Sequence, residues 1–158
     1  MKKLSFIALL IGLYYCGSVA NDVDEADLDG IRNEIKEMFT AYDDSVRSKG
    51  LLGEFDFLDN SDNFFWVPPG YNSALSYDSV RSILTQNAPN FKSVHFQWID
   101  QKINPLSKKI ANYTGLVKSE MIDLNDVKTT LFILESGTVI KRDDSWKILS
   151  GQSRIKTN

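Results

Sequence analysis

The pattern of apolar and polar positions predicts helices first and strands afterwards. From Leu28 to Val46, apolar residues recur every three or four positions with charged residues between them, as in an amphipathic helix. The acid-rich start at Asp22 suits a helix N-terminus, and Gly50 suits its end, because glycine readily adopts left-handed backbone conformations. The apolar stripe comprises Leu28, Ile31, Ile35, Met38, Tyr42 and Val46.

Shorter elements are expected next. Residues 51–58 predict a second, short helix or a turn. Residues 64–67 predict a short strand that ends at Pro68 or runs at a sheet edge, because proline cannot donate to a sheet ladder. Ser76 can cap a third helix, which ends near Pro89.

After Asn90 the apolar period changes to two, which is typical of strands. We expect a first strand interrupted at Asn104–Pro105, with Phe96 and Trp98 on one face and His95 on the other. Three further strands are expected at 110–122, 127–141 and 146–155. On the last of these, alternation predicts a shared face for Trp146, Ile148, Ser150 and Gln152. Helices followed by antiparallel strands indicate an α+β fold, with a sheet covered on one face by the long helix.

Composition narrows the function classes. The chain has 158 residues, enough for one domain, and a formal net charge of −3 without a basic cluster, so we do not expect a nucleic-acid partner. Its single Cys and single His exclude an internal disulfide framework, a Cys-based zinc site and His-rich metal ligation. We expect no metal and no cofactor.

The first twenty residues have the features of a signal peptide. Lys2 and Lys3 precede an apolar run too short to span a membrane, and Ser18 and Ala20 form a small-x-small cleavage signal. We therefore expect a signal peptide at 1–20, a single domain at 21–158, and export to the periplasm or the medium. The alternative is a lipid anchor on Cys16, which the bulky residues before it disfavour.

Three segments carry a resemblance to a known family. They are the Phe-Phe-Trp-Val-Pro-Pro-Gly run at 64–70, the Ala111 and Gly115 spacing on a long strand, and Arg-Asp-Asp-Ser-Trp-Lys-Ile at 142–148. Together with the element order, they make the chain similar to the nuclear transport factor 2-like superfamily, and within it to SnoaL-like exported proteins. The resemblance implies a cone-shaped, cystatin-like α+β roll, with about three N-terminal helices packed on a strongly curved antiparallel sheet. It also implies a pocket inside the cone and a homodimer formed through the outer sheet face.

The expected pocket is lined by aromatic side chains and a few polar groups, as small-molecule sites usually are. The alternative is that these aromatic residues simply fill the core. The candidate ligand-binding residues are Trp66, Tyr71, Phe96, Trp98, Tyr113, Phe132, Ser150 and Gln152.

The family's usual catalytic groups are absent at the matching positions. Many relatives carry His where this chain has Ser150 and Gln152, and neither residue is a general base at neutral pH. A carboxylate inside an apolar cone could replace them, because burial raises its pKa. The alternative for each acid is a solvated turn or helix surface. The scattered acids considered for this role are Asp43, Asp44, Asp56, Asp62 and Glu135.

Three functions remain open from the sequence. The first is a domain that binds a small, partly apolar molecule without chemistry. The second is a SnoaL-like isomerase, cyclase or hydrolase-type enzyme that uses a pocket Asp or Tyr. A buried Asp or Glu facing Tyr71 or Tyr113 would favour this enzyme. The third is a protein-interaction module, which a completely filled cone would favour.

Overall fold

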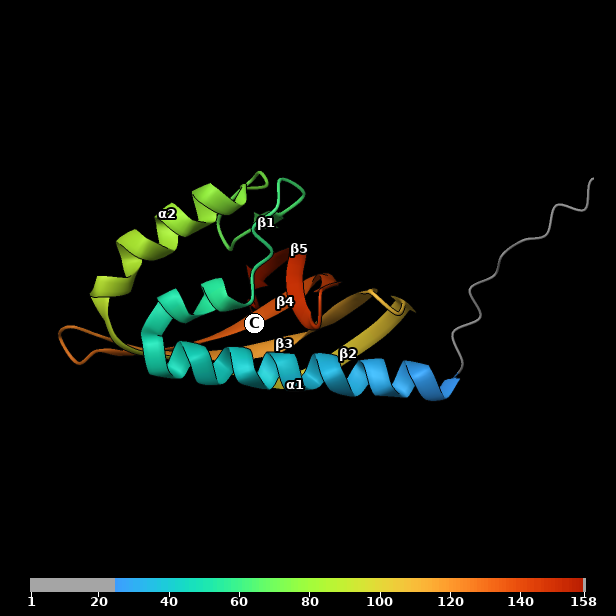
Figure 1. Ribbon diagram of the computed structural model, residues 1–158. Helices are drawn as coiled ribbons and strands as arrows, with labels where there is room; N and C mark the ends of the chain where they lie inside the picture. Colours follow the sequence, from blue (N-terminus) through green and yellow to red (C-terminus); the bar gives the residue numbers. More distant parts are fainter. Residues whose placement is uncertain (1–24, 158) are drawn as a thin grey trace, which may run out of the picture.

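The computed structural model describes residues 25–157. The expected signal peptide and Cys16 lie outside these residues. Within them, no helix is long and apolar enough to cross a membrane. The elements follow in the order α1 (Glu25–Lys49), η1 (Gly50–Asp56), β1 (Phe65–Val67), α2 (Tyr77–Asn87), η2 (Ala88–Asn90), β2 (Phe91–Ser107), β3 (Ile110–Asp123), β4 (Lys128–Arg142) and β5 (Ser145–Ile155), where η marks a 3-10 helix (Figure 1).

The α+β class and the helical stripe are confirmed. On α1, Ile35 and Val46 have no exposed surface, and Ile31 and Met38 are buried with them. Gly50 ends α1 with a positive φ of 64°, a conformation that costs glycine little. The short second helix is the 3-10 helix η1, and Ser76 caps α2 by accepting a hydrogen bond from the Ser79 N–H.

The five strands form one sheet in the order β1-β5-β4-β3-β2. Strand β1 lies at the edge, as expected, but it pairs with β5 in parallel, so the sheet is mixed rather than wholly antiparallel. The expected interruption at Asn104–Pro105 is wrong. Strand β2 continues through Pro105, which pairs with Ala111. Proline is tolerated there because β2 is the other edge strand and needs no ladder donor on its free side.

Helix α1 lies in front of β2 and β3 in Figure 1 and extends along the sheet. Near its start, the Glu34 carboxylate accepts hydrogen bonds from Lys141 and from the Trp146 indole, both on the β4–β5 hairpin. Near its end, the Asp43 carboxylate accepts a hydrogen bond from the Phe96 N–H of edge strand β2 at 2.9 Å. These contacts fix both ends of the helix over opposite sides of the sheet, and the interior of the fold lies between them.

The segment between η1 and β1 is held against β5. The Asp59 N–H donates to the Ile148 carbonyl, and the Ile148 N–H donates to the Phe57 carbonyl. Asp59 is 3% exposed, and its carboxylate accepts a hydrogen bond from Arg142 at 2.6 Å. Burial opposes its ionisation, but hydrogen bonds from Arg142 and Ser61 hold the pKa of Asp59 below its usual value. This anchor places Leu58 at the inner face of the fold.

Three aromatic side chains lie over glycines of neighbouring strands. A Cβ on Gly115 would lie 2.8 Å from the Trp98 ring, and one on Gly137 would lie 2.9 Å from the Tyr113 ring. A Cβ on Gly151 would collide with Trp66 on β1 in the same way. At Gly115 and Gly137 a Cβ would also collide with a backbone carbonyl, that of Asp100 and that of Ser150, so glycine permits the close approach of both backbone and ring there.

We expect Gly151→Ala to lower the free energy of unfolding by about 1–3 kcal/mol, because the new methyl group overpacks against Trp66. The control is Gly30→Ala on α1, where a Cβ meets nothing within 4 Å. That change should stabilise the protein by about 0.5–1 kcal/mol, since alanine is the better helix residue. Urea denaturation of both variants measures the difference, and equal effects would contradict the proposed role of Gly151.

Candidate functional site

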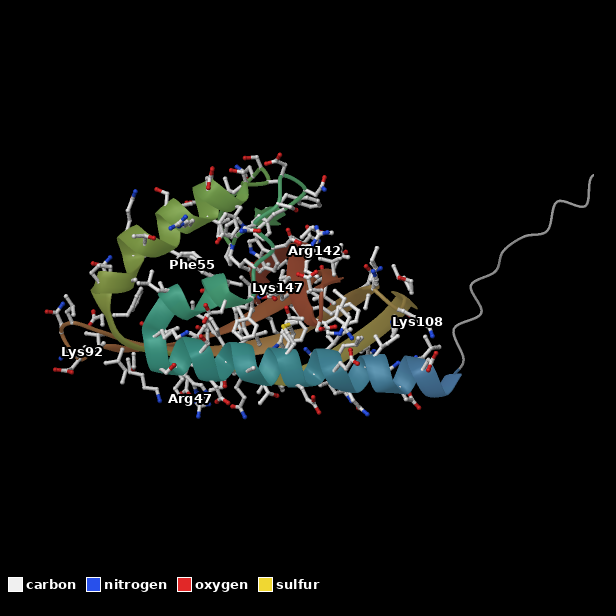
Figure 2. The ribbon with its side chains drawn as sticks, viewed as in Figure 1. Arg47, Phe55, Lys92, Lys108, Arg142 and Lys147 are labelled. Atoms are coloured by element: carbon white, nitrogen blue, oxygen red, sulfur yellow. The ribbon has the colours of Figure 1, made fainter. Side chains whose placement is uncertain are left out.

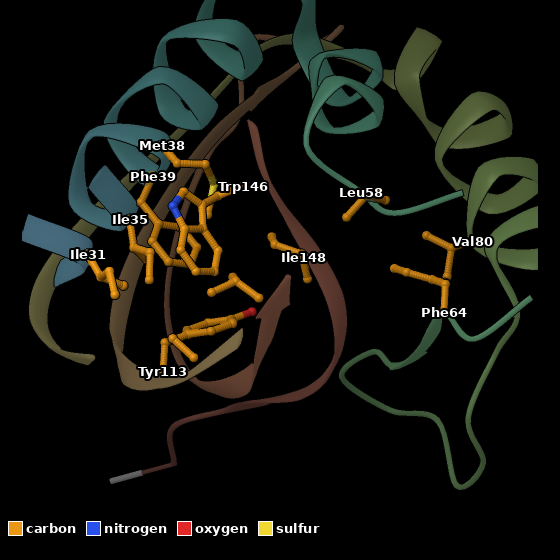
Figure 3. Close-up of a cluster of buried hydrophobic side chains, with 12 residues drawn as sticks. Ile31, Ile35, Met38, Phe39, Leu58, Phe64, Val80, Tyr113, Trp146 and Ile148 are labelled. Atoms are coloured by element: carbon orange, nitrogen blue, oxygen red, sulfur yellow. The ribbon is translucent and has the colours of Figure 1, made fainter. Parts of the chain in front are cut away.

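A cavity of about 200 Å³ lies between the helices and the inner face of the sheet. Leu58, Phe64 and Val80 approach it from the η1–α2 side, and Ile148 lies between this group and the side chains of α1 (Figure 3). The wall is mainly apolar. Its aromatic members are Phe39, Tyr42, Phe64, Trp66, Phe96 and Trp98, and its polar members include Glu54, Glu135 and Ser153.

Glu54 reaches the cavity because η1 folds back tightly on α1. Gly50 turns the chain at the end of the helix, and Gly53 has no Cβ to collide with the backbone of Ser45. The close approach sets Glu54 beside Tyr42, and the Tyr42 hydroxyl donates a hydrogen bond to Glu54 Oε2 at 2.9 Å.

Glu135 reaches the same cavity from strand β4. Its neighbours across the inner face are Gly115 on β3 and Ser153 on β5. The Tyr113 ring lies over Gly137, and its hydroxyl donates a hydrogen bond to Glu135 Oε1 at 3.1 Å. The absence of a side chain at Gly137 thus leaves space for the Tyr113 ring, whose hydroxyl binds Glu135.

Burial raises the pKa of both carboxyl groups. Desolvation raises the pKa of Glu54 to about 7, and the Tyr42 hydrogen bond only partly opposes it. Desolvation also raises the pKa of Glu135 to about 7, helped by the nearby Glu54 charge and opposed by the Tyr113 hydrogen bond. Burial and the neighbouring glutamates raise the pKa of both tyrosines well above 10, so both phenols remain donors.

Both glutamates have pKa values raised to near neutral pH. Near neutral pH each carboxyl group can therefore act as a proton donor or as a proton acceptor. Among the described residues, no Lys, Arg or His lines the cavity to neutralise them. Residues 25–157 also bring no three His, Cys, Asp or Glu side chains together as a metal site would require.

Three of the eight ligand-binding residues expected from the sequence line this cavity, and a fourth contacts one of its glutamates. Trp66, Phe96 and Trp98 are in the cavity wall. Tyr113 is 3% exposed and does not line the cavity itself, but it holds the Glu135 carboxyl in place.

Tyr71 and Phe132 lie away from the cavity. Tyr71 is 44% exposed in the loop that Pro68 and Gly70 turn outward, with φ +86° at Gly70. Phe132 is 43% exposed and pairs with Lys118 on the outer sheet face, because its neighbour Ile133 takes the inward position.

Strand alternation predicted that Ser150 and Gln152 share the inward face of Trp146 and Ile148, but a register shift moves them off it. Val139 pairs with Ile148 and Thr138 pairs with Ser150, so Leu149 is an extra residue, a β-bulge. Beyond the bulge the faces exchange. Ser153 lines the cavity, whereas Gln152 is exposed and Ser150 is buried away from the cavity wall.

The lone histidine lies outside the site. His95 contacts Arg47 at 2.7 Å and Asp43 at 3.3 Å, on the strand face opposite Phe96 and Trp98. Of the acids considered from the sequence, Glu135 alone is at the cavity. Asp43 and Asp56 are used in surface hydrogen bonds, and Asp44 and Asp62 are exposed.

The sequence reading overlooked Glu54 and Phe39. Phe39 is 2% exposed and packs on Trp98 and Tyr113, with ring centroids 5.0 Å and 4.8 Å apart. One signal was available for Glu54: it lies in a short segment between Gly53 and Phe55, where a charged side chain follows a glycine suited to close packing.

No protein-family model matches the chain, and no curated protein matches it. Solved structures do. A nuclear transport factor 2-like superfamily protein from Salmonella enterica serovar Typhimurium superposes with a TM-score of 0.67 at 13% identity, over 82% of this chain and 94% of that one. The chain has the nuclear transport factor 2-like fold.

Enzymes with this fold are similar at the same level. A hexachlorocyclohexane dehydrochlorinase from Novosphingobium barchaimii matches with a TM-score of 0.66 at 12% identity, over 85% of this chain and 92% of that one. A protein assigned as a scytalone dehydratase, from Novosphingobium aromaticivorans, matches at 0.70 and 16% identity, over 80% and 84%. At these identities the similarity establishes the nuclear transport factor 2-like fold and nothing about the reaction.

We expect the buried glutamates to make stability fall as pH rises. Their folded-state pKa lies above the unfolded value, so the stability present near pH 4.5 is lost as pH rises through about 7. Relative to wild type, the Glu54→Gln/Glu135→Gln double variant should gain on the order of 6 kcal/mol between pH 4.5 and pH 8, with each carboxyl group contributing about half. Urea denaturation at both pH values tests this, and a parallel pH dependence of the two proteins would contradict it.

Proposed function

We propose that the protein binds a small, mostly apolar molecule in the cavity, with Glu54 and Glu135 as its polar contacts. The observation that carries this proposal is the pair of tyrosine-bonded carboxyl groups in an otherwise apolar, aromatic wall. A few placed polar groups in an apolar hollow are what a small-molecule site needs. A carboxyl pair is a costly way to fill a core, so its presence supports a ligand rather than packing.

The cavity size fits a molecule of about one ring. An apolar cavity of about 150 Å³ is large enough to hold benzene, and this one measures about 200 Å³. The third function considered from the sequence, a protein-interaction module, required side chains to fill the cone completely. The remaining space favours a ligand instead.

Blocking the cavity tests the proposal. Ser153→Leu places an apolar side chain on the cavity wall, whereas the adjacent Gln152→Leu places the same side chain on an exposed position. Native mass spectrometry, on protein from its own host and after incubation with a library of ring-sized compounds, should show bound molecules for wild type and Gln152→Leu only. Equal binding by Ser153→Leu, with an unchanged melting temperature, would contradict the proposal.

A second candidate function is an acid–base enzyme, and the Glu135–Tyr113 pair favours it. A carboxylate in the cavity could take a proton from the carbon beside a substrate carbonyl, while the protonated partner donates a hydrogen bond to the carbonyl oxygen. The proton returns to another carbon in an isomerisation, so no co-reactant is needed. The two dehydrohalogenase- and dehydratase-like neighbours show that this fold accommodates enzymes.

Exchange of carbon-bound hydrogen tests this chemistry without knowledge of the substrate. In D₂O, the wild type should accelerate deuterium incorporation beside the carbonyl of a small cyclic ketone, followed by NMR. Glu135→Gln should lose about 10²–10⁴-fold of that acceleration. The control is Glu37→Gln on the exposed side of α1. Equal loss in both variants, or none in either, would contradict the enzyme proposal.

We also propose that the mature protein acts outside the cytoplasm as a homodimer. The amino-terminal sequence supports export. The outer sheet face supports the dimer, because Phe132 is 43% exposed there and Leu116 and Leu134 pair beside it. The native mass spectra described above report the subunit number directly.

A further inference from the structure

The cavity wall contains two carboxyl groups with unused acceptor oxygens, and no basic side chain among the described residues lines it. Tyr42 occupies Glu54 Oε2 and Tyr113 occupies Glu135 Oε1, and no hydrogen bond from residues 25–157 reaches the other oxygen of either carboxyl. Both of those oxygens are at least partly exposed, since neither is among the buried atoms that lack a hydrogen-bond partner. Both glutamates line the cavity, so each brings to its wall a carboxyl group with one oxygen that has no hydrogen bond from the described residues.

The basic side chains of residues 25–157 lie away from the cavity. Arg47, Lys92 and Lys108 lie at the outside of the molecule (Figure 2), each within 2.9 Å of an acidic partner. Arg142 is bound to Asp59, and Lys147 donates to the backbone carbonyl of Asp56. In the described part of the chain, the cavity glutamates therefore have no positive side chain against them.

The remaining wall also suits a positive charge. The faces of aromatic rings attract cations, most strongly when water is excluded, and Trp66, Trp98 and Phe96 all line the cavity. An anionic ligand would instead meet two carboxyl groups without a compensating charge, which is unfavourable in a desolvated site.

We propose that the ligand of this cavity carries a protonated amine, seated between the Glu54 and Glu135 carboxyl groups, with its apolar part against the aromatic wall. This inference rests on the proposed ligand-binding function and specifies its charge class. A cation between the two carboxyl groups would stabilise their negative charge, so its binding should favour the ionised form of both glutamates.

A series of matched probes tests the charge class. Benzylamine, benzyl alcohol and sodium benzoate have nearly the same shape and carry a positive, a neutral and a negative polar group. Titrated by calorimetry at pH 7.5, benzylamine should bind at least tenfold more tightly than benzyl alcohol, and benzoate should not bind. Benzylamine affinity should also rise between pH 5 and pH 8, because the glutamates ionise while the amine stays protonated.

Two variants separate the carboxyl contribution from folding and from net charge. The Glu54→Gln/Glu135→Gln variant should lose the preference for benzylamine yet still bind benzyl alcohol, which shows that its cavity is intact. Glu37→Gln, which removes one charge from the exposed side of α1, should behave as wild type. Benzyl alcohol binding as tightly as benzylamine to wild type would overturn the amine inference and leave the ligand-binding function standing. Failure of all three probes at millimolar concentration would overturn both.

Discussion

The close approach of aromatic rings to strand glycines is the constraint on which this structure depends. Trp98, Tyr113 and Trp66 each lie where the Cβ of a neighbouring residue would otherwise stand. Trp66 and Trp98 also line the cavity of about 200 Å³ that lies between the helices and the sheet. Phe39 of α1 then packs on Trp98 and Tyr113, so the helix position follows from the same arrangement.

The same constraint creates the chemistry. Because Tyr113 lies over Gly137, its hydroxyl reaches Glu135. Because Gly53 lets η1 approach Ser45, Glu54 comes within reach of Tyr42. Each carboxyl group is thus held by a phenol that stays protonated, and a single hydrogen bond offsets only part of the cost of burial. The fold tolerates this cost at one place, which is typical of a site kept for function rather than for stability.

Much of the fold could be predicted from the sequence, because its helices and strands follow from local periodicity. The stripe from Leu28 to Val46, the turn at Gly50 and the Ser76 cap are local features, and the structure has all three. The aromatic members of the site, Trp66, Phe96 and Trp98, could be placed on the inner face because alternation holds along the strand segments that carry them.

What the tertiary structure alone decided depends on pairing between distant segments. The bulge at Leu149 arises from the register of β5 against β4, and it moved Ser153 into the cavity wall in place of Gln152. The Glu54 and Glu135 carboxyl groups are 81 positions apart in the chain, and no local pattern indicates that they share one cavity. The sequence by itself therefore determined most of the elements and three members of the aromatic wall, since these follow from neighbouring residues. The acidic pair was decided by the packing of η1 on α1 and of β4 between its neighbours, because only that packing brings both half-buried groups to one cavity.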